Sequence, residues 1–239
     1  MRIFSFAIGN IWRWGANINR AELVSYAQKL DVSGVEITFA KKEELYNFKL
    51  NKKQIKRFRE LDYVSIHAPF RLVRRADNEK EVLKQLDYIE YFYKKINAQN
   101  VIIHPNELPK PGILRRYKMK FSTENLPKKR HVDIKKMSAI LKKYKNLGLC
   151  LDVAHAYYWS KYETGRLVRK FRDRITQVHL SGNYKKEDHV SLRKVSPEFM
   201  KSIEPIKKLN VPIVIEEDIK VKNVKWVEKE IGYIKSLFE

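Results

Sequence analysis

Short apolar segments separated by longer amphipathic stretches recur along the whole chain of 239 residues, and this alternation restricts the fold more than any other feature. It is typical of a parallel β-sheet whose strands are joined by helices. Segments such as 101–103 and 212–215 are apolar without a break, as expected for strands covered on both faces. We expect eight strands, over residues 3–8, 34–39, 63–68, 101–104, 120–124, 148–152, 177–180 and 212–216.

The stretches between these strands have apolar residues at spacings of three and four, which predicts helices. We expect them over residues 21–30, 52–59, 80–96, 133–144, 164–171, 197–209 and 224–238. Segment 105–119 contains Pro109, Pro111 and Gly112, so the helix after the fourth strand should be short or missing. Eight such units favour an α/β fold with a single (β/α)₈ barrel domain over residues 1–239. An open doubly wound sheet is the alternative, but no strand is followed by a Gly-x-Gly-x-x-Gly fingerprint.

Composition places the protein in the cytoplasm and away from membranes. No apolar run approaches the ~18 to 20 residues that span a bilayer, and residues 1–6 read as a strand rather than as an export signal. The single cysteine, Cys150, cannot form an internal disulfide, which fits a reducing compartment. We expect it to be a small core residue.

Charge favours a polyanionic partner. The chain has 50 Lys and Arg against 28 Asp and Glu, a formal net charge of +22. An excess of one sign this large attracts polyanions, although a solvated basic surface without a partner has the same composition.

Polar residues of the kinds that bind metals stand at the ends of the expected strands. They are His67, His104, Glu124, Asp152, His179 and Glu216. In a closed barrel the C-terminal ends of the strands meet at one mouth, so these side chains should form a cluster. Imidazole and carboxylate ligands suit Zn²⁺, Mn²⁺ or Fe²⁺, and the lack of cysteine ligands argues against a structural thiolate site.

Five segments in this series resemble the xylose-isomerase-like barrel superfamily, and within it most of all endonuclease IV, the second family of AP endonucleases. They are Ser-Ile-His-Ala-Pro-Phe at 65–70, Ile-Ile-His-Pro at 102–105, Thr-Glu-Asn at 123–125, Cys-Leu-Asp-Val-Ala-His-Ala at 150–156 and Val-His-Leu at 178–180. The resemblance runs from about residue 63 to 217. Its strength is the ordered series rather than any one motif.

The resemblance implies three metal sites. His67, His104 and Glu124 would hold the first, and Glu124 would bridge to a second site completed by Asp152, His179 and Glu216. The third would take His155, His189 and either Asp188 or Glu187, because the family's Asp-x-His pattern appears here as Glu187-Asp188-His189 without the glycine that follows it. Two or three divalent ions are therefore expected, with Zn²⁺ favoured and Mn²⁺ as the alternative.

The activity that the resemblance implies is cleavage of DNA on the 5′ side of abasic sites by a metal-activated hydroxide, with Glu124 and Glu216 as the catalytic carboxylates. Paired metals about 3.5 to 4 Å apart can activate a water and stabilise both the attacking and the leaving oxygen. Candidate contacts to the DNA backbone, chosen by position, are Arg71, Arg74 and Arg75 after the third strand and Arg115 and Arg116 in the irregular segment.

A sugar isomerase or epimerase of the same superfamily is the rival interpretation. Such enzymes use a Glu, Asp, His, Glu metal site, so Glu124, Asp152, His179 and Glu216 fit both, and the two glutamates would then act as general acid and base on a small sugar. Residues 34–37 resemble these isomerases as well. The extra pair His67 and His104, the third site and the net charge favour the nuclease, whereas Asn106 replaces the glycine usual after the His-Pro of that family.

Overall fold

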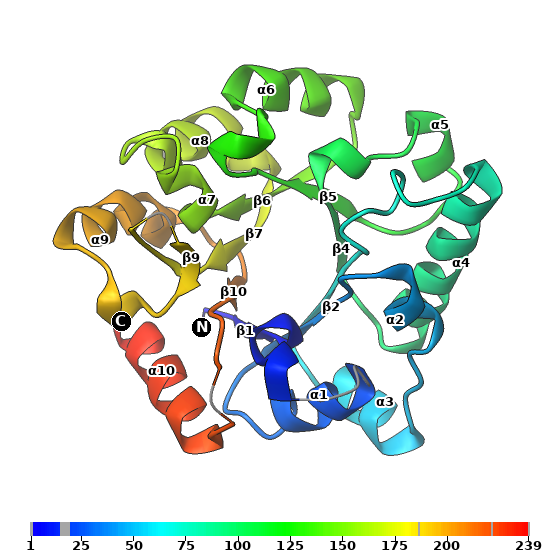
Figure 1. Ribbon diagram of the computed structural model, residues 1–239, viewed down its shortest axis with the longest axis horizontal. Coiled ribbons are helices and arrows are strands. Elements are labelled where there is room, and N and C mark those ends of the chain that lie inside the picture. The colour runs from blue at the N-terminus through cyan, green and yellow to red at the C-terminus, as the bar shows by residue number, and fades with distance from the viewer. Residues whose placement is uncertain (1, 15–19, 186, 221, 239) are drawn as a thin grey trace.

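The computed structural model describes residues 2–14, 20–185, 187–220 and 222–238, and its centre is a closed barrel of eight parallel strands (Figure 1). Around the barrel they follow the order β1-β10-β7-β6-β5-β4-β3-β2, which confirms the predicted (β/α)₈ architecture. The strands are β1 (Phe4–Ala7), β2 (Gly34–Thr38), β3 (Tyr63–His67), β4 (Asn100–Ile103), β5 (Phe121–Glu124), β6 (Gly148–Asp152), β7 (Ile175–Leu180) and β10 (Ile213–Ile215).

Helices form a ring outside the barrel (Figure 1). They are α1 (Arg20–Ala27), α2 (Lys42–Tyr46), α3 (Lys52–Arg59), α4 (Glu79–Lys95), α5 (Pro111–Leu114), α6 (Ile134–Lys143), α7 (Val153–Tyr157), α8 (Glu163–Phe171), α9 (Pro197–Ile203) and α10 (Val224–Ser236). The unit after β4 has only the 3₁₀ turn η2 (Pro105–Glu107) and the single turn α5, as its prolines predicted. None of the helices in the described ranges is both long and apolar enough to cross a bilayer.

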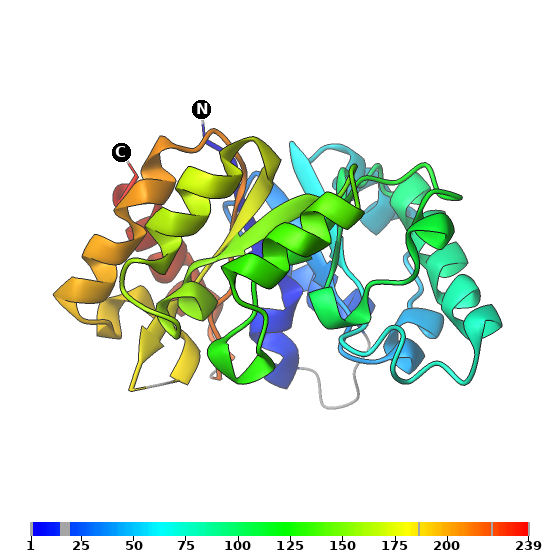
Figure 2. The same ribbon diagram turned by 90° about the horizontal axis from the view of Figure 1, so that it is seen from above.

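Three features differ from the sequence prediction. The expected helix 197–209 is divided into α9 and the 3₁₀ segment η6 (Glu204–Lys208), because Pro205 has no N–H to continue the α-helical ladder. The short helices α2 and α7 were not predicted. Nor was an antiparallel hairpin of β8 (Gly182–Tyr184) and β9 (Glu187–Val190), which leaves the barrel on the side opposite to both chain ends (Figure 2).

Local capping explains where several helices begin. The Asn51 side chain accepts a hydrogen bond from the Gln54 amide while the Gln54 side chain accepts one from the Asn51 amide, which is a complete capping box at α3. At the starts of α4, α6 and α9, the side chains of Asn78, Asp133 and Ser196 each accept one hydrogen bond from a backbone amide in the first turn. The helix starts are therefore encoded within a few residues of each cap.

The interior of the barrel below the mouth is polar, and hydrogen bonds join the side chains at its centre. The Tyr63 hydroxyl donates to Gln177 Oε1 over 2.6 Å, and the Asn100 amide donates to the same oxygen over 2.9 Å. The Gln177 amide nitrogen in turn donates to Glu36 Oε2 over 2.8 Å. Because these groups are buried, each bond satisfies a donor or acceptor that would otherwise cost about 1–3 kcal/mol. The network joins β2, β3, β4 and β7.

We predict opposite effects on stability for two glycine-to-alanine substitutions. At Gly34 a Cβ would lie 2.6 Å from the Tyr63 carbonyl oxygen and 3.0 Å from Ser5 Cβ, so Gly34→Ala should lower the free energy of unfolding, by about 1–3 kcal/mol. At Gly232, inside α10, nothing lies within 4 Å of such a Cβ, so Gly232→Ala should raise it, by about 0.5–1 kcal/mol. Urea unfolding followed by circular dichroism measures both, and equal midpoints for Gly34→Ala and the wild type would contradict the close approach of β2 to β3.

Candidate metal centre

The six residues expected at strand ends all lie at the C-terminal mouth of the barrel. His67, Glu124 and Asp152 are the last residues of β3, β5 and β6, and His179 is the next to last of β7. His104 and Glu216 directly follow β4 and β10. Closure of the sheet therefore brings together side chains that are separated by up to 149 positions in the sequence, from 67 to 216.

The first group that could hold a metal is His67, His104 and Glu124, whose ligand atoms lie within 4.8 Å of one another. Glu124 Oε2 is 3.4 Å from His67 Nε2 and 3.5 Å from His104 Nε2. His67 Nδ1 is 2.9 Å from the Ala68 carbonyl oxygen. A proton on Nδ1 would be donated to that oxygen, which leaves the Nε2 lone pair directed at the group. The Phe70 ring stacks on His104 and meets His67 edge-on, so it shields this side of the cluster.

The second group is Glu124, Asp152, His179 and Glu216. Three of its buried atoms, Asp152 Oδ2, His179 Nδ1 and Glu216 Oε2, have no hydrogen-bond partner among the described residues. His179 Nδ1 lies 3.1 Å from Glu216 Oε2 and 3.8 Å from Glu124 Oε1. Unpaired buried polar atoms are costly, and the convergence of several on one point fits the binding of a cation there.

The third group is His155, Asp188 and His189. His155 lies on α7, where its amide donates to Asp152 Oδ1 over 2.6 Å, and its Nε2 is 3.7 Å from Asp188 Oδ2. His189 has a left-handed backbone with φ of 57°, and its Nδ1 is 2.8 Å from the Glu216 carbonyl oxygen. The hairpin β8–β9 thus carries two of the three members. Between the two candidate acids the geometry selects Asp188, because the exposed Glu187 lies outside the group.

Glu124 connects the groups through its two oxygens. Oε2 faces His67 and His104, whereas Oε1 is 2.9 Å from His155 Nδ1 and 3.8 Å from His179 Nδ1. Burial raises the pKa of Glu124, but hydrogen bonds from the four surrounding histidine rings outweigh it and hold the pKa well below its usual range. The carboxylate is therefore ionised and available to bridge two cations.

The neighbouring acids and His155 titrate far from their usual ranges. Burial raises the pKa of Asp152 to about 7. Burial also raises that of Glu216, but the charge of His179 outweighs it and the pKa falls to about 2. Burial lowers the pKa of His155, yet Asp152 and Glu124 more than compensate and raise it to about 10. A cation bound by these histidine and carboxylate atoms would compete with protons for them, so metal binding would release protons.

Glu36 is a buried part of the centre that the sequence analysis did not select as a site residue. It is fully buried on β2, where Oε2 accepts from Ser65 Oγ over 2.8 Å and lies 3.3 Å from His179 Nε2. The Gln177 side-chain amide nitrogen lies 2.9 Å from the same Nε2 and donates to Glu36 Oε2 over 2.8 Å. A proton on Nε2 would be held by Glu36 and would leave Nδ1, the atom that faces Glu216, free to bind a metal. A charged residue inside an apolar strand was the signal in the sequence.

The arginines expected to contact DNA occupy different environments. Arg71 and Arg75 follow Pro69 in the sequence and line a small cavity together with Lys41, Lys42 and Glu43. Arg74 forms an ion pair with the buried Glu107, which also accepts from the Arg74 amide over 3.0 Å. These three therefore lie on the loop that follows β3.

Arg115 and Arg116 lie elsewhere. Both are exposed, and Arg115 lines a cavity with Tyr144 and Leu147. Those two residues belong to the segment that leads into the N-terminal end of β6, whereas the metal groups lie at the C-terminal ends of the strands. The structure does not bring Arg115 together with Arg71 and Arg75.

The chain belongs to the xylose isomerase-like TIM barrel family, whose model matches residues 106–237. Comparison with curated proteins found no significant match. Among solved structures, a D-tagatose 3-epimerase-like protein is 18% identical with a TM-score of 0.72 and coverage of 98% of this chain and 96% of the other. Endonuclease IV from Thermus thermophilus is also 18% identical, with a TM-score of 0.66 and coverage of 98% and 99%. A probable 3-DHS dehydratase from Bacillus anthracis is 12% identical, with a TM-score of 0.73 and the same coverage. At these identities the neighbours share the fold, and their reactions differ.

We predict that Glu36→Gln weakens metal binding, because the neutral amide no longer stabilises a proton on His179 Nε2. The dissociation constant for Zn²⁺, measured by competition with a chromophoric chelator, should rise about tenfold or more. Ser65→Ala is the matched control, since it removes another hydrogen bond to the same carboxylate without altering the charge beside His179. If both variants bind Zn²⁺ as the wild type does, Glu36 has no role in orienting the ring.

Proposed function

We propose that this protein is a metal-dependent phosphodiesterase that cleaves DNA on the 5′ side of abasic sites. The observation that carries the proposal is that three groups of side chains able to bind a metal lie side by side at one mouth of the barrel. Two of them share Glu124, and His155 of the third lies 2.9 Å from it. The group Glu124, Asp152, His179 and Glu216 alone would be sufficient for a one-metal sugar enzyme. The other two groups would then have no role, although their ligand atoms lie within 4.8 Å of one another.

The donor sets fit Zn²⁺ best, since they combine imidazole with carboxylate and contain no thiolate, and Mn²⁺ is the alternative. Divalent cations held there would supply Lewis-acid activation of a phosphodiester and charge stabilisation for the attacking and leaving oxygens. Glu124 would join the first two sites through its separate oxygens. Asp152, Glu216 and Asp188 would supply the remaining negative charge. Contacts of His67, His179 and His189 with the Ala68 carbonyl, Glu36 and the Glu216 carbonyl would orient the imidazole ligands.

The charge distribution supports DNA as the substrate. The chain carries a net charge of +22. Arg71, Arg75, Lys41 and Lys42 line one cavity next to the segment that carries His67, and Glu43 is the single carboxylate in that lining. Phosphate attraction by such side chains supplies most of the affinity of sequence-independent DNA binding. Arg74 is less available because of its ion pair with Glu107.

A sugar isomerase or epimerase is the second candidate, and the buried Glu36 is the observation that favours it. Glu36 lies in the Gly-Val-Glu-Ile segment that resembles those enzymes, and a D-tagatose 3-epimerase-like protein shares the fold. Under this alternative one metal would bind in the Glu124 and Glu216 group, with those two glutamates as general acid and base.

The deciding experiment combines elemental analysis of the purified protein with incubation on a DNA duplex that carries one abasic site. We expect two or three metals per chain and a nick on the 5′ side of the lesion that EDTA prevents. One metal per chain with intact DNA would reject the nuclease and direct the search to sugars.

A pair of neighbouring substitutions sharpens this experiment. Asp188→Asn should remove one metal equivalent and lower the cleavage rate about tenfold or more, because it neutralises an acid of the third group. Glu187→Gln removes the same charge one residue away but outside the group, so it should retain both. The reverse result would assign the third site to Glu187, as the family's Asp-x-His spacing implies.

We also predict that the DNA contacts lie on the β3 side of the mouth. Replacing Arg71 and Arg75 together by alanine should make the plot of log affinity against log salt concentration shallower by about 1 to 2. Replacing Arg115 and Arg116 together is the charge-matched control and should leave the slope unchanged. Filter binding to an uncleavable duplex at several salt concentrations measures both, and a larger effect of the second pair would place the DNA on the opposite side.

A further inference from the structure

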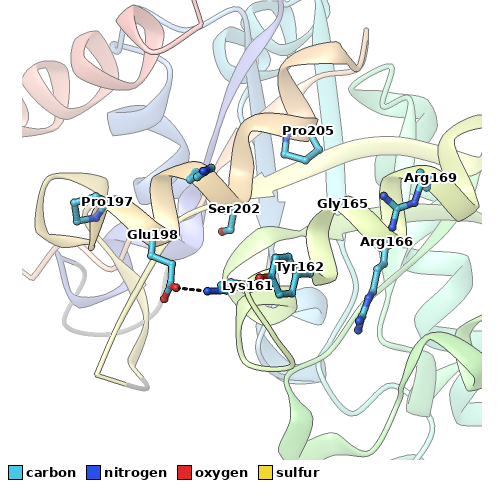
Figure 3. Close-up of a pocket in the computed structure, with 10 residues that line it drawn as sticks. Lys161, Tyr162, Gly165, Arg166, Arg169, Pro197, Glu198, Ser202 and Pro205 are labelled. Carbon is cyan, nitrogen blue, oxygen red and sulfur yellow. Dashed lines mark hydrogen bonds and ion pairs between the residues drawn. The ribbon is translucent and has the colours of Figure 1, made fainter.

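An open cavity, here called the groove, lies outside the metal centre between α8 and α9 (Figure 3). Its volume is about 740 Å³, and no residue of the three metal groups lines it. This volume is within the range that holds a small ligand or a few side chains of a partner. The family resemblance gives this groove no role, and the proposed cleavage of DNA does not use it.

The middle of the groove is uncharged because of two residues that face each other. Gly165 of α8 has no side chain, and a Cβ built there would lie 3.6 Å from Cγ of Pro205 in η6. Pro197 and Ser202 line the same cavity (Figure 3). α8 and η6 therefore approach closely at a point where neither presents a long side chain, and an open, largely apolar surface results.

The rims of the groove are strongly basic. Lys161, Arg166, Arg169 and Lys201 line it against one carboxylate, Glu198. Glu198 is paired with Lys161 over 2.8 Å. Arg166 lies 3.4 Å from Glu163.

The other two rim cations are unpaired. Within the part of the chain that the structure describes, no carboxylate lies within 4.0 Å of the charged nitrogens of Arg169 or Lys201. Arg166 and Arg169 project from the same helix on one side of the groove (Figure 3).

We propose that this groove binds an acidic, amphipathic segment of a partner protein. Apolar side chains of such a segment would cover the surface at Gly165 and Pro205, and its carboxylates would pair with Arg166, Arg169 and Lys201. An amphipathic helix that lays its apolar face into a groove between two helices is a common mode of recognition. Arginine is, with tryptophan and tyrosine, one of the residues that contribute most to the affinity of such interfaces.

Two other occupants fit less well. A nucleic acid strand would use the cations but has no need of an apolar surface, and its bases stack on several aromatic rings. This groove offers one, Tyr162, with 63% of its surface exposed. A second copy of this chain carries a net charge of +22, so it would be repelled from a basic rim.

The test measures fluorescence anisotropy of three labelled probes with the full-length protein. The first is a helical 14-residue peptide with Asp and Glu on one face and Leu and Phe on the other, and the second has the same residues scrambled so that no apolar face forms. The third is an oligothymidylate of the same net charge. We expect saturable binding of the first probe and at least about tenfold weaker binding of the other two.

Substitutions then locate the site. Gly165→Leu fills the groove without changing the charge and should weaken binding of the first probe at least about tenfold. Leucine is favoured over glycine inside a helix, so the variant should fold. Arg169→Glu with Lys201→Glu should weaken binding as well, whereas Lys80→Glu with Lys94→Glu, which reverses two exposed charges on α4, should not.

Any of three results would overturn the proposal: absence of binding by the first probe, unchanged binding by Gly165→Leu, or equal losses from the two double charge reversals. The groove would instead be assigned to nucleic acid if the oligothymidylate bound more tightly than the first peptide and if Gly165→Leu weakened that binding. All variants should keep the wild-type metal content and the wild-type activity on the abasic duplex. Failure of the groove and failure of the proposed nuclease are thus separate outcomes.

Discussion

The rest of the site depends on one interaction, the contact of the buried Glu124 carboxylate with four surrounding histidines. Glu124 ends β5 with 2% of its surface exposed, and histidines from three other strand ends and from α7 surround it. A carboxylate with this little hydration is stable only when opposite charge or hydrogen-bond donors compensate for the lost water. The histidine rings supply that compensation in the protein alone. Divalent cations between the same groups would supply more, because each carries two positive charges and satisfies atoms that now have no hydrogen-bond partner.

The polar network beneath the mouth gives these ligands a fixed orientation. Glu36, Gln177 and Tyr63 are joined by hydrogen bonds across the interior of the barrel, and Glu36 contacts the back of the His179 ring. An apolar interior would be sufficient to close the barrel. The polar interior instead contacts the His179 ring at Nε2, the nitrogen that faces away from the other candidate ligands. Metal sites generally restrict the tautomer of a ligating histidine by such a contact. The close approach of β2 to β3 at Gly34 is part of the same arrangement, since Glu36 lies two residues further along β2.

Much of the fold was predictable because its signals are local. Each apolar run became a strand, and the bounds of β6 and α3 agree with the prediction at both ends, in α3 because the capping box of Asn51 and Gln54 fixes the first turn. The predicted secondary structure was wrong at the end of α9, where the proline signal was read incompletely, and at the hairpin β8–β9, where the local signal is weak. Pro205 within a periodic stretch ends α9, and the hairpin β8–β9 has too few apolar residues to be recognised as a pair of strands.

For the candidate site, too, some features follow from local sequence and others from the tertiary structure. The sequence by itself determined which residue types stand at the strand ends, because the apolar period identifies the strand and the next polar residue marks its end. It also determined the basic excess and the short unit after β4. Only the tertiary structure decided that Asp188 rather than Glu187 joins His155 and His189, that Glu36 contacts His179, and that Arg74 is engaged by Glu107 while Arg115 lies away from the other arginines. The groove between α8 and α9 likewise exists only in the folded chain. These are distances between segments far apart in sequence, and barrel closure sets them through strand register, hairpin geometry and side-chain rotamers that no local pattern contains.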